Sequence, residues 1–378
     1  MSKGSEGVGG GWFWGVVAIL GTLVAWSVAP LLIRSFRDVV DPHTSNAVRY
    51  ATAAVIWGPV LWLAVRGGRV DGKLLKRAAV PVFWNAVAQV CFTMSFYEID
   101  PGLVTFALRA QIATVAIVAP FLFPRERKLL GSWRFLAGLA MVLTGVLAMA
   151  WLGLSASRAG VLTEVGFWQM ARGFGLAMMA GVGYAGYALG VRKCLDGVPH
   201  TISFAVIGWT TALVMVVVMV VASPTRGMEV FEVSLGEYGR LLLTGVIGIA
   251  ASHVLYYFAM ERLGVALASG MIQTQPVFVA TASALVYGER LLLGQWGFGG
   301  LAIAGAVTMV WAQHTIHRRE RAVAELAAGE GNVALYEAER GGGEAAAMDV
   351  AEEDGGEGAT GGGVGDTSVD PTRVGKAN

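Results

Sequence analysis

The 378-residue sequence predicts an all-α membrane protein, with ten transmembrane helices in two inverted five-helix repeats and a disordered, acidic C-terminal tail. Three observations lead to this fold class: a strongly apolar composition, ten apolar segments long enough to cross a bilayer, and a ten-residue stretch that occurs twice. Hydrophobic residues make up 55% of the chain and charged residues only 15%, and the mean hydropathy is +0.60. These values lie outside the range of soluble globular domains.

The apolar segments have the length of about 20 residues that an α-helix needs to cross the hydrocarbon core. We expect helices because lipid offers a backbone no hydrogen-bond partner, and the sequence lacks the alternating strands of a barrel. The first segment is too long for a signal peptide, so we expect it to remain as an anchor. The predicted spans are 12–33, 44–65, 78–97, 102–123, 133–153, 168–190, 201–222, 239–260, 264–287 and 293–313.

The charges of the loops predict how these spans are oriented. Five bases follow span two and four follow span four, whereas the loops at the opposite end hold fewer bases or a net acidic charge. Short loops rich in Lys and Arg face the cytoplasm. We therefore expect an integral, multi-pass protein of a bacterial inner (cell) membrane, with both termini in the cytoplasm.

The duplicated stretch predicts that the ten spans are two copies of one unit. Residues 126–135 and 289–298 are identical at seven of ten positions, and each stretch lies between two apolar segments. Each copy contains five spans, an odd number, so we expect the second copy to be inserted upside down relative to the first. Inverted repeats of this kind build many secondary transporters, with the substrate site between the two halves.

The tail differs in composition from the rest of the chain. Residues 323–378 hold 12 acids against 3 bases, a net charge of −9, and few aromatic side chains. Such a segment cannot bury enough apolar area to offset the entropy of ordering. We expect it to act as a solubilising tail, with binding of an unknown basic partner as the alternative. The predicted segments are an N-terminus 1–11, a first repeat 12–153, an extracytoplasmic linker 154–167, a second repeat 168–313 and a cytoplasmic low-complexity tail 314–378.

Short motifs in both halves match those of a known family. They are Trp26-Ser27, Arg49, Tyr97, Pro101-Gly102 and Pro124-Arg-Glu126-Arg in the first half, and Tyr256-Tyr-Phe-Ala-Met-Glu-Arg-Leu-Gly264, Gln273-Thr-Gln-Pro276 and Tyr287-Gly-Glu289-Arg in the second. With these motifs, residues 12–313 resemble the drug/metabolite transporter superfamily, in its EamA-like ten-helix branch. The chain departs from that family at two positions. Ala113 stands at the offset where Pro276 stands in the second half, and Arg109 lies deep in span four.

The resemblance implies a central cavity between the halves, lined by spans one to four and six to nine, with spans five and ten at the periphery. It implies transport but names no substrate, because the superfamily handles amino acids, drugs, nucleosides and sugar phosphates.

Two arginines inside the spans are the main candidates for substrate contact. Arg109 lies about 10 Å into span four, where an arginine costs roughly 2.5–3.5 kcal/mol to insert. It either binds an anionic group of the substrate, such as a carboxylate, or reaches outward to Glu98 or Asp100. Arg49 lies near the outer end of span two, where snorkelling to the interface is the default and a substrate or gate role is the alternative.

No predicted span contains an Asp or Glu, which argues against the usual route of proton coupling. His253 either bonds a neighbouring helix or relays protons. Glu126 and Glu289 are predicted to cap helix ends and anchor loops.

Asn85, Gln111 and Tyr187 are further polar candidates. The predicted substrate-binding residues are Trp26, Arg49, Gln89, Arg109, Tyr184, His253, Tyr256, Gln273 and Gln275.

Several chemical motifs are missing or misleading. The sequence holds no P-loop, zinc-protease helix, paired-cysteine motif or nucleophile elbow, so we expect no catalytic site, cofactor or metal ion. Gly181-Val-Gly183-Tyr-Ala-Gly186 matches a dinucleotide fingerprint in letters only. It lies inside span six, where small residues allow helices to pack closely.

These observations predict a secondary transporter or facilitator that moves a small metabolite by alternating access, in the direction of export. The substrate would be an amino acid or a related organic anion or amphipathic compound. The alternatives are a receptor or assembly subunit in the membrane, and an enzyme on a transporter-like scaffold. The expected partners are the small-molecule substrate and the lipid bilayer; no nucleic acid is expected, and a homodimer is left open.

Overall fold

A computed structural model describes residues 7–161, 165–289 and 291–319 of the chain. The chain divides into a unit of residues 1–316 and a second unit of residues 317–378. The predicted acidic tail falls outside the described residues from position 320 onward. The account below concerns the first unit.

The described part of this unit is helical throughout. Its helices are α1 (Gly7–Arg34), α2 (Pro42–Arg66), α3 (Gly72–Glu98), α4 (Pro101–Ala107), α5 (Ala110–Leu122), α6 (Trp133–Arg158), α7 (Phe167–Cys194), α8 (His200–Ala222), α9 (Leu235–Gly245), α10 (Ser252–Leu263), α11 (Val265–Ile272) and α12 (Gln275–Tyr287). Short 3₁₀ or π segments are η1 (Pro124–Gly131), η2 (Met228–Phe231) and η3 (Val246–Ala251), and a last helix covers Leu293–Arg319.

Nine helices in the described residues are long and apolar enough to cross a membrane. They correspond to nine of the ten predicted spans. The remaining prediction, span 264–287, differs from the structure because this segment is two shorter helices, α11 and α12, separated at Gln273 and Thr274. Span four has a similar interruption between α4 and α5, at Leu108 and Arg109.

Polar side chains fix where several helices begin. Asp41 accepts hydrogen bonds from the backbone N–H groups at the start of α2, and Asp71 does the same for α3. Ser132 caps α6, and Ser234 and Glu237 form a capping box at the start of α9. These side chains satisfy backbone donors that have no partner within a helix.

Glycines set the closest helix contacts, as expected from the small residues of span six. A Cβ atom on Gly183 would lie 2.9 Å from the backbone of Ala88, and one on Gly186 would lie 2.5 Å from the ring of Trp84. The letter match to a dinucleotide fingerprint is therefore a packing seam between α7 and α3. A second seam joins α6 to the last helix, where a Cβ on Gly145 would lie 2.5 Å from the Phe298 carbonyl oxygen.

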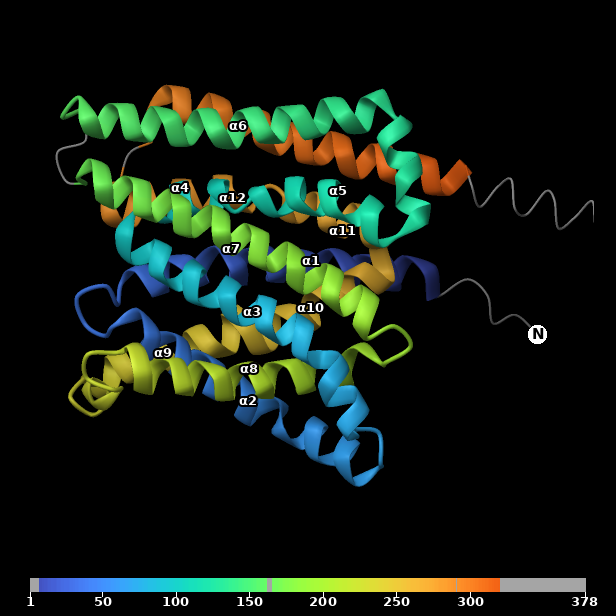
Figure 1. Cartoon of the computed structure of the whole chain (residues 1–378), viewed down its shortest axis with the longest axis horizontal. Coiled ribbons are helices and arrows are strands. Elements are labelled where there is room, and N and C mark those ends of the chain that lie inside the picture. The colour runs from blue at the N-terminus through green and yellow to red at the C-terminus, as the bar shows by residue number, and fades with distance from the viewer. Residues whose placement is uncertain (1–6, 162–164, 290, 320–378) are drawn as a thin grey trace, which may run out of the picture. The chain divides into compact units, whose positions relative to one another are not determined.

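The helices run back and forth between two ends of the bundle. Figure 1 shows the turn between α5 and α6 at one end, together with the turns between α2 and α3 and between α7 and α8. The end of α12, with Glu289 beyond it, lies at the opposite end, together with the connections from α1 to α2 and from α8 to α9. We call these the Glu126 end and the Glu289 end.

Candidate functional site

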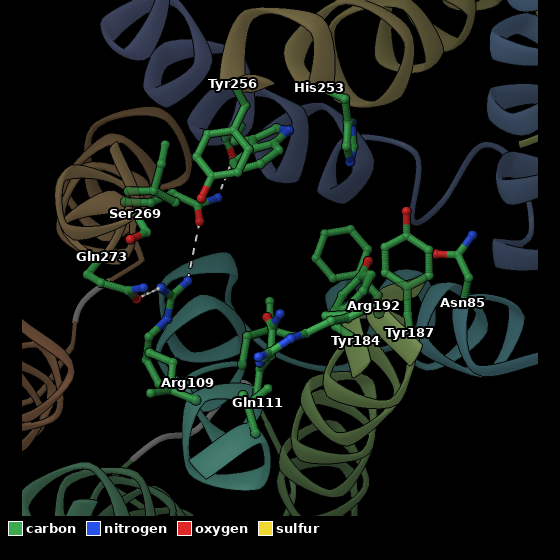
Figure 2. A pocket seen from close by; sticks show the side chains of 18 of the residues that line it. Asn85, Arg109, Gln111, Tyr184, Tyr187, Arg192, His253, Tyr256, Ser269 and Gln273 are labelled. Carbon is green, nitrogen blue, oxygen red and sulfur yellow. Dashed lines mark hydrogen bonds between the residues drawn. The ribbon is translucent and has the colours of Figure 1, made fainter. Parts of the chain in front are cut away.

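A cavity of about 530 Å³ lies among the helices of the first unit, large enough for a small metabolite. Figure 2 shows Arg109, Ser269 and Gln273 on one side of it, Asn85, Tyr184 and Tyr187 on the other, with Tyr256 and His253 along the edge between them. The wall contains all nine residues predicted from the sequence: Trp26, Arg49, Gln89, Arg109, Tyr184, His253, Tyr256, Gln273 and Gln275.

The first interrupted helix brings Arg109 into the cavity. Around the interruption the backbone changes to bonds between residues three apart, from Arg109 N–H to Phe106 and from Ile112 N–H to Arg109. No proline is present at this point: the first half, which has Ala113 at the offset of Pro276, interrupts its helix without one. Arg109 as a residue is 8% exposed, so the interruption places a cation inside the bundle.

The second interrupted helix supplies the partners of this arginine. Arg109 donates from Nη1 to Oε1 of Gln273 at 2.5 Å and from Nη2 to Oε1 of Gln275 at 3.3 Å. Gln275 in turn donates from Nε2 to the carbonyl oxygen of Trp26 at 2.6 Å. The outward reach to Glu98 is therefore not observed, and Glu98 instead pairs with Arg172 at 3.4 Å. The two interruptions face each other and are joined by hydrogen bonds from the charged guanidinium to neutral amide oxygens.

Arg49 is more deeply buried than the sequence suggested. Its exposed fraction is 2%, so the expectation that it snorkels to the interface is wrong. Its Nη1 donates to Thr93 Oγ1 at 3.1 Å and to Asn46 Oδ1 at 3.5 Å, whereas its Nε has no partner among the described residues. At the same place α9 packs closely against the backbone of α2, since a Cβ on Gly245 would lie 2.6 Å from the Arg49 carbonyl oxygen.

Neutral polar groups on α3 continue the wall from Arg49. Asn85 donates from Nδ2 to the hydroxyls of Tyr50 at 3.1 Å and Thr211 at 3.0 Å, which joins α3 to α2 and α8. Gln89, one turn further along, is 8% exposed, and its Oε1 has no partner among the described residues. This part of the wall therefore holds a buried, unpaired amide oxygen one turn from Thr93, which accepts a hydrogen bond from Arg49.

Aromatic rings form another part of the wall. The ring of His253 lies 5.4 Å from that of Trp26 and 5.0 Å from that of Phe204, and Tyr256 lies 5.2 Å from Trp26. His253 Nδ1 is 2.9 Å from the carbonyl oxygen of Ile249 in the preceding turn. The expected bond from His253 to a neighbouring helix is thus replaced by a bond within its own segment. These rings offer flat apolar surface to a bound molecule.

A π-helical turn, η3, directly precedes His253 and was not anticipated from the sequence. Such turns insert an extra residue into a helix and occur often at functional sites. The residues of this turn, Val246–Ala251, include Gly248 and Ile249, which line the cavity. The only sequence signal was a pair of glycines, Gly245 and Gly248, within an apolar span.

The cavity reaches one end of the bundle and stops short of the other. Glu126 and Arg192 line it and form an ion pair at 2.7 Å, with Arg192 half-exposed and Glu126 buried. Phe135 of α6 and Gln313 of the last helix also line this end, so spans five and ten are not wholly peripheral as the resemblance implied. Neither Glu289 nor its ion-pair partner Arg34, 3.1 Å away, lines the cavity.

The Glu289 end carries several contacts between segments far apart in sequence. Glu289 also accepts from the Ser283 hydroxyl, and the hydroxyl of Tyr287 donates to the carbonyl oxygen of Leu31 at 2.7 Å. The hydroxyl of Tyr97 donates to the carbonyl oxygen of Val40 at 2.8 Å. The predicted role of Glu289 as a loop anchor is confirmed, although its base is contributed by α1. Together these bonds tie the end of α1 to α12 and Glu289, and the segment after α1 to α3.

A pair of carboxyl groups lies beside these contacts. The backbone N–H of Asp41 donates to Oε1 of Glu229 at 2.7 Å, and Ser223 Oγ donates to Oδ2 of Asp41 at 2.7 Å. Burial and a hydrogen bond between the two carboxyl side chains raise the pKa of Glu229 to about 6, against the backbone N–H of Asp41, which lowers it. Burial opposes ionisation of Asp41 as well, but hydrogen bonds from Glu229, Thr44 and Ser223 outweigh it and lower the pKa of that carboxyl. The pair therefore holds a proton on Glu229 under mildly acidic conditions.

Among the described residues, no group of three or more His, Cys, Asp or Glu side chains is placed to hold a metal ion. The chemistry that the cavity offers is recognition, by two guanidinium groups, several amides and hydroxyls, and aromatic faces.

Comparisons with known proteins agree with this architecture. The EamA-like transporter family matches residues 171–311, which cover α7 to most of the last helix. One solved structure, a crystal structure of a protein, shares the fold at a TM-score of 0.53 and 15% sequence identity, over 80% of this chain and 98% of that one. No curated protein matches the sequence.

The family match lies on the second half of the helical unit, and the fold match extends over most of the chain. The chain is an integral multi-pass membrane protein, and residues 171–311 are an EamA-like transporter family domain, consistent with the drug/metabolite transporter superfamily.

Proposed function

We propose that this protein is a secondary transporter or facilitator that moves a small organic anion across the membrane by alternating access. The observation that carries the proposal is the cavity of about 530 Å³ with Arg49 and Arg109 buried in its wall. A buried guanidinium is costly unless it is paired, and neither arginine forms an ion pair among the described residues. A bound anion would supply the missing charge.

The contacts at the two ends support alternating access. Glu126 and Arg192 pair at one end, and Glu289 and Arg34 pair at the other. Each pair joins a duplicated motif to a helix of the opposite half, so each can open only when the halves move relative to each other. In the present state the cavity extends to the Glu126 end, and the contacts at the Glu289 end lie beyond its limit.

We propose export as the direction of transport. Bases gather at the Glu126 end, including Lys128 and Lys193, which is the pattern of a cytoplasmic surface. With that orientation the present state opens to the cytoplasm, the side from which an exported solute would be collected. Both termini would be cytoplasmic, in the inner membrane of a bacterium.

The proposal also needs the α11–α12 segment to act as a tenth crossing and the halves to be inverted. Cysteines introduced singly at Lys128 and Leu293, then treated with a membrane-impermeant thiol reagent on intact cells, test this topology. We expect labelling at position 293 alone. Labelling of both positions from outside, or of neither, would overturn the inverted arrangement. Native Cys91 and Cys194 are replaced by serine beforehand.

Transport itself is tested with purified protein in liposomes loaded with a labelled organic anion. We expect saturable efflux that is lost on Arg109→Gln, with Arg172→Gln as the matched control because that arginine is exposed and lies away from the cavity. Saturable binding without flux would favour the receptor alternative. An enzyme is disfavoured because the matching family is one of transporters and the cavity wall offers no catalytic cluster among the described residues.

A further inference from the structure

The charges on the cavity wall do not balance. Among the described residues that line it, the cations are Arg49, Arg109 and Arg192, and the carboxylate is Glu126. Glu126 and Arg192 neutralise each other at 2.7 Å. Arg49 and Arg109 are left as two positive charges in a region where solvent screening is weak.

Both guanidinium groups keep donors to spare. Each carries five N–H groups. Arg49 bonds two neutral oxygen atoms, both from Nη1, and its Nε has no partner among the described residues. Arg109 bonds the carbonyl of Thr105 and the amides of Gln273 and Gln275, all of them neutral. Each arginine can therefore still receive a carboxylate, which a guanidinium binds through two parallel bonds.

The second half carries no arginine at the corresponding places. Arg109 stands at the interruption of the first half, and the interruption of the second half carries Gln273 and Thr274. Arg49 is the eighth residue of α2, and the eighth residue of α8, the helix in the same place of the second half, is Ile207. The two positive charges therefore belong to the first half alone.

The two arginines also belong to different parts of the wall. Arg49 contacts α3 through Thr93, and Arg109 contacts α12 through Gln275. Arg49 and Arg109 are held by separate sets of neutral partners, so each can be offered a carboxylate of its own.

We propose that the cavity selects compounds with two carboxylate groups, one bound by Arg109 and the other by Arg49. This inference rests on the proposed transport function for its biological use, but the binding step can be tested without transport. The unpartnered Oε1 of Gln89 adds an acceptor near Arg49 for a hydroxyl or amino group of the same compound.

The test compares three matched sets of probes on purified full-length protein at low salt. Succinate, glutarate, adipate and isophthalate carry two carboxylates at different spacings; butyrate, valerate, hexanoate and benzoate carry one; the corresponding diamides carry none. Binding is measured by calorimetry and by the shift of the unfolding midpoint, since a ligand stabilises the state it binds. We expect at least one dicarboxylate to bind about 10- to 100-fold more tightly than its monocarboxylate and diamide counterparts.

Substitutions assign the two ends of the probe. Arg49→Gln and Arg109→Gln should each lower the affinity of the preferred dicarboxylate to that of its monocarboxylate counterpart, while Arg172→Gln leaves it unchanged. Arg49→Lys, which keeps the charge in case Arg49→Gln fails to fold, should retain part of the preference. Circular dichroism and monodisperse elution report whether each variant is folded.

Three outcomes overturn the inference: no dicarboxylate binds, monocarboxylates or diamides bind as tightly, or the preference survives Arg49→Gln. Other results distinguish this inference from the proposed function. Tight dicarboxylate binding without flux in liposomes would contradict transport and support the two-carboxylate site. Flux of monocarboxylates or neutral solutes that does not depend on Arg49 would support transport and contradict the two-carboxylate site.

Discussion

The two interrupted helices of this protein have the same backbone and different side chains. α4–α5 and α11–α12 both change to three-residue hydrogen bonding in mid-helix, at Leu108–Arg109 and at Gln273–Thr274. One interruption presents a guanidinium and the other presents amides that accept from it. The geometry therefore belongs to both halves, whereas the charge belongs to one. This difference suggests a division that the following experiments test: shared features would build the scaffold, and features of one half would set what the cavity binds.

The largest expected effect comes from making the neutral interruption acidic. Gln273→Glu would place a carboxylate against Arg109 and neutralise it without a substrate. We expect the apparent Km for the transported anion to rise by about 30-fold or more, because the guanidinium is already occupied. Uptake into liposomes measures this change. Gln273→Asn, which stays neutral, is the control, and an unchanged Km in the acidic variant would contradict the division of roles between the two interruptions.

The ion pairs at the two ends are shared features whose burial differs. The side chains of Arg34 and Glu289 are 15% and 10% exposed, whereas Arg192 is 51% exposed beside Glu126. We expect Arg34→Gln to lower the free energy of unfolding by about 1–3 kcal/mol, because it leaves a carboxylate largely buried and unpaired. Arg192→Gln should cost a similar amount, because Glu126 is only 3% exposed and would also be left buried and unpaired. Unfolding in detergent compares the two variants, and a loss confined to one of them would show that the two ends are held unequally.

The glycine seam between α6 and the last helix joins the final helices of the two halves. A Cβ on Gly145 would lie 2.5 Å from the carbonyl oxygen of Phe298, whereas one on Gly175, within α7, would meet nothing within 4 Å. We expect Gly145→Ala to destabilise the fold by about 1–2 kcal/mol through overpacking. Gly175→Ala should leave stability unchanged or raise it, since alanine favours helix. Matching thermal midpoints for the two variants would argue against a tight seam.

The smallest expected effect is a pH dependence of the Glu289 end. The folded pKa of Glu229 is raised to about 6, so its stabilising contact with Asp41 is complete below the ordinary glutamate value and is lost as pH rises through about 6. Accessibility of a cysteine at Val40 to an impermeant reagent should therefore increase modestly between pH 5 and pH 7. Glu229→Gln should remove this dependence, and a dependence that persists in the variant would assign it to another group.

Much of the fold could be predicted because the signals lie in short stretches of sequence. Each helix is marked by an apolar segment of bilayer length. The duplicated motif and the glycines of span six can also be recognised without knowing which residues they contact. The break at Leu108–Arg109 could not be read in this way, because no proline marks it and it depends on contacts with α7 and α12.

For the candidate site, the residues of the cavity wall could be predicted from the sequence, but their contacts could not. The polar residues of the spans could be predicted to line a cavity, because lipid excludes them, and all nine do line one. Their partners could not be predicted. The bond from Arg109 to Gln273 joins positions 164 residues apart, and the buried Arg49 bonds Thr93 of another helix, 44 residues away. Arg192 was passed over because a base at a helix end is usually solvated.

The motif glutamates take their bases from across the molecule: Glu126 from α7, in the second half, and Glu289 from α1, in the first. Each half thus contributes the acid at one surface and the base at the other. If the chain were cut between α6 and α7 and the fragments were made separately, each would carry one orphaned acid and one orphaned base. Mixing the fragments would restore both pairs at once, so reassembly is expected to be all-or-none.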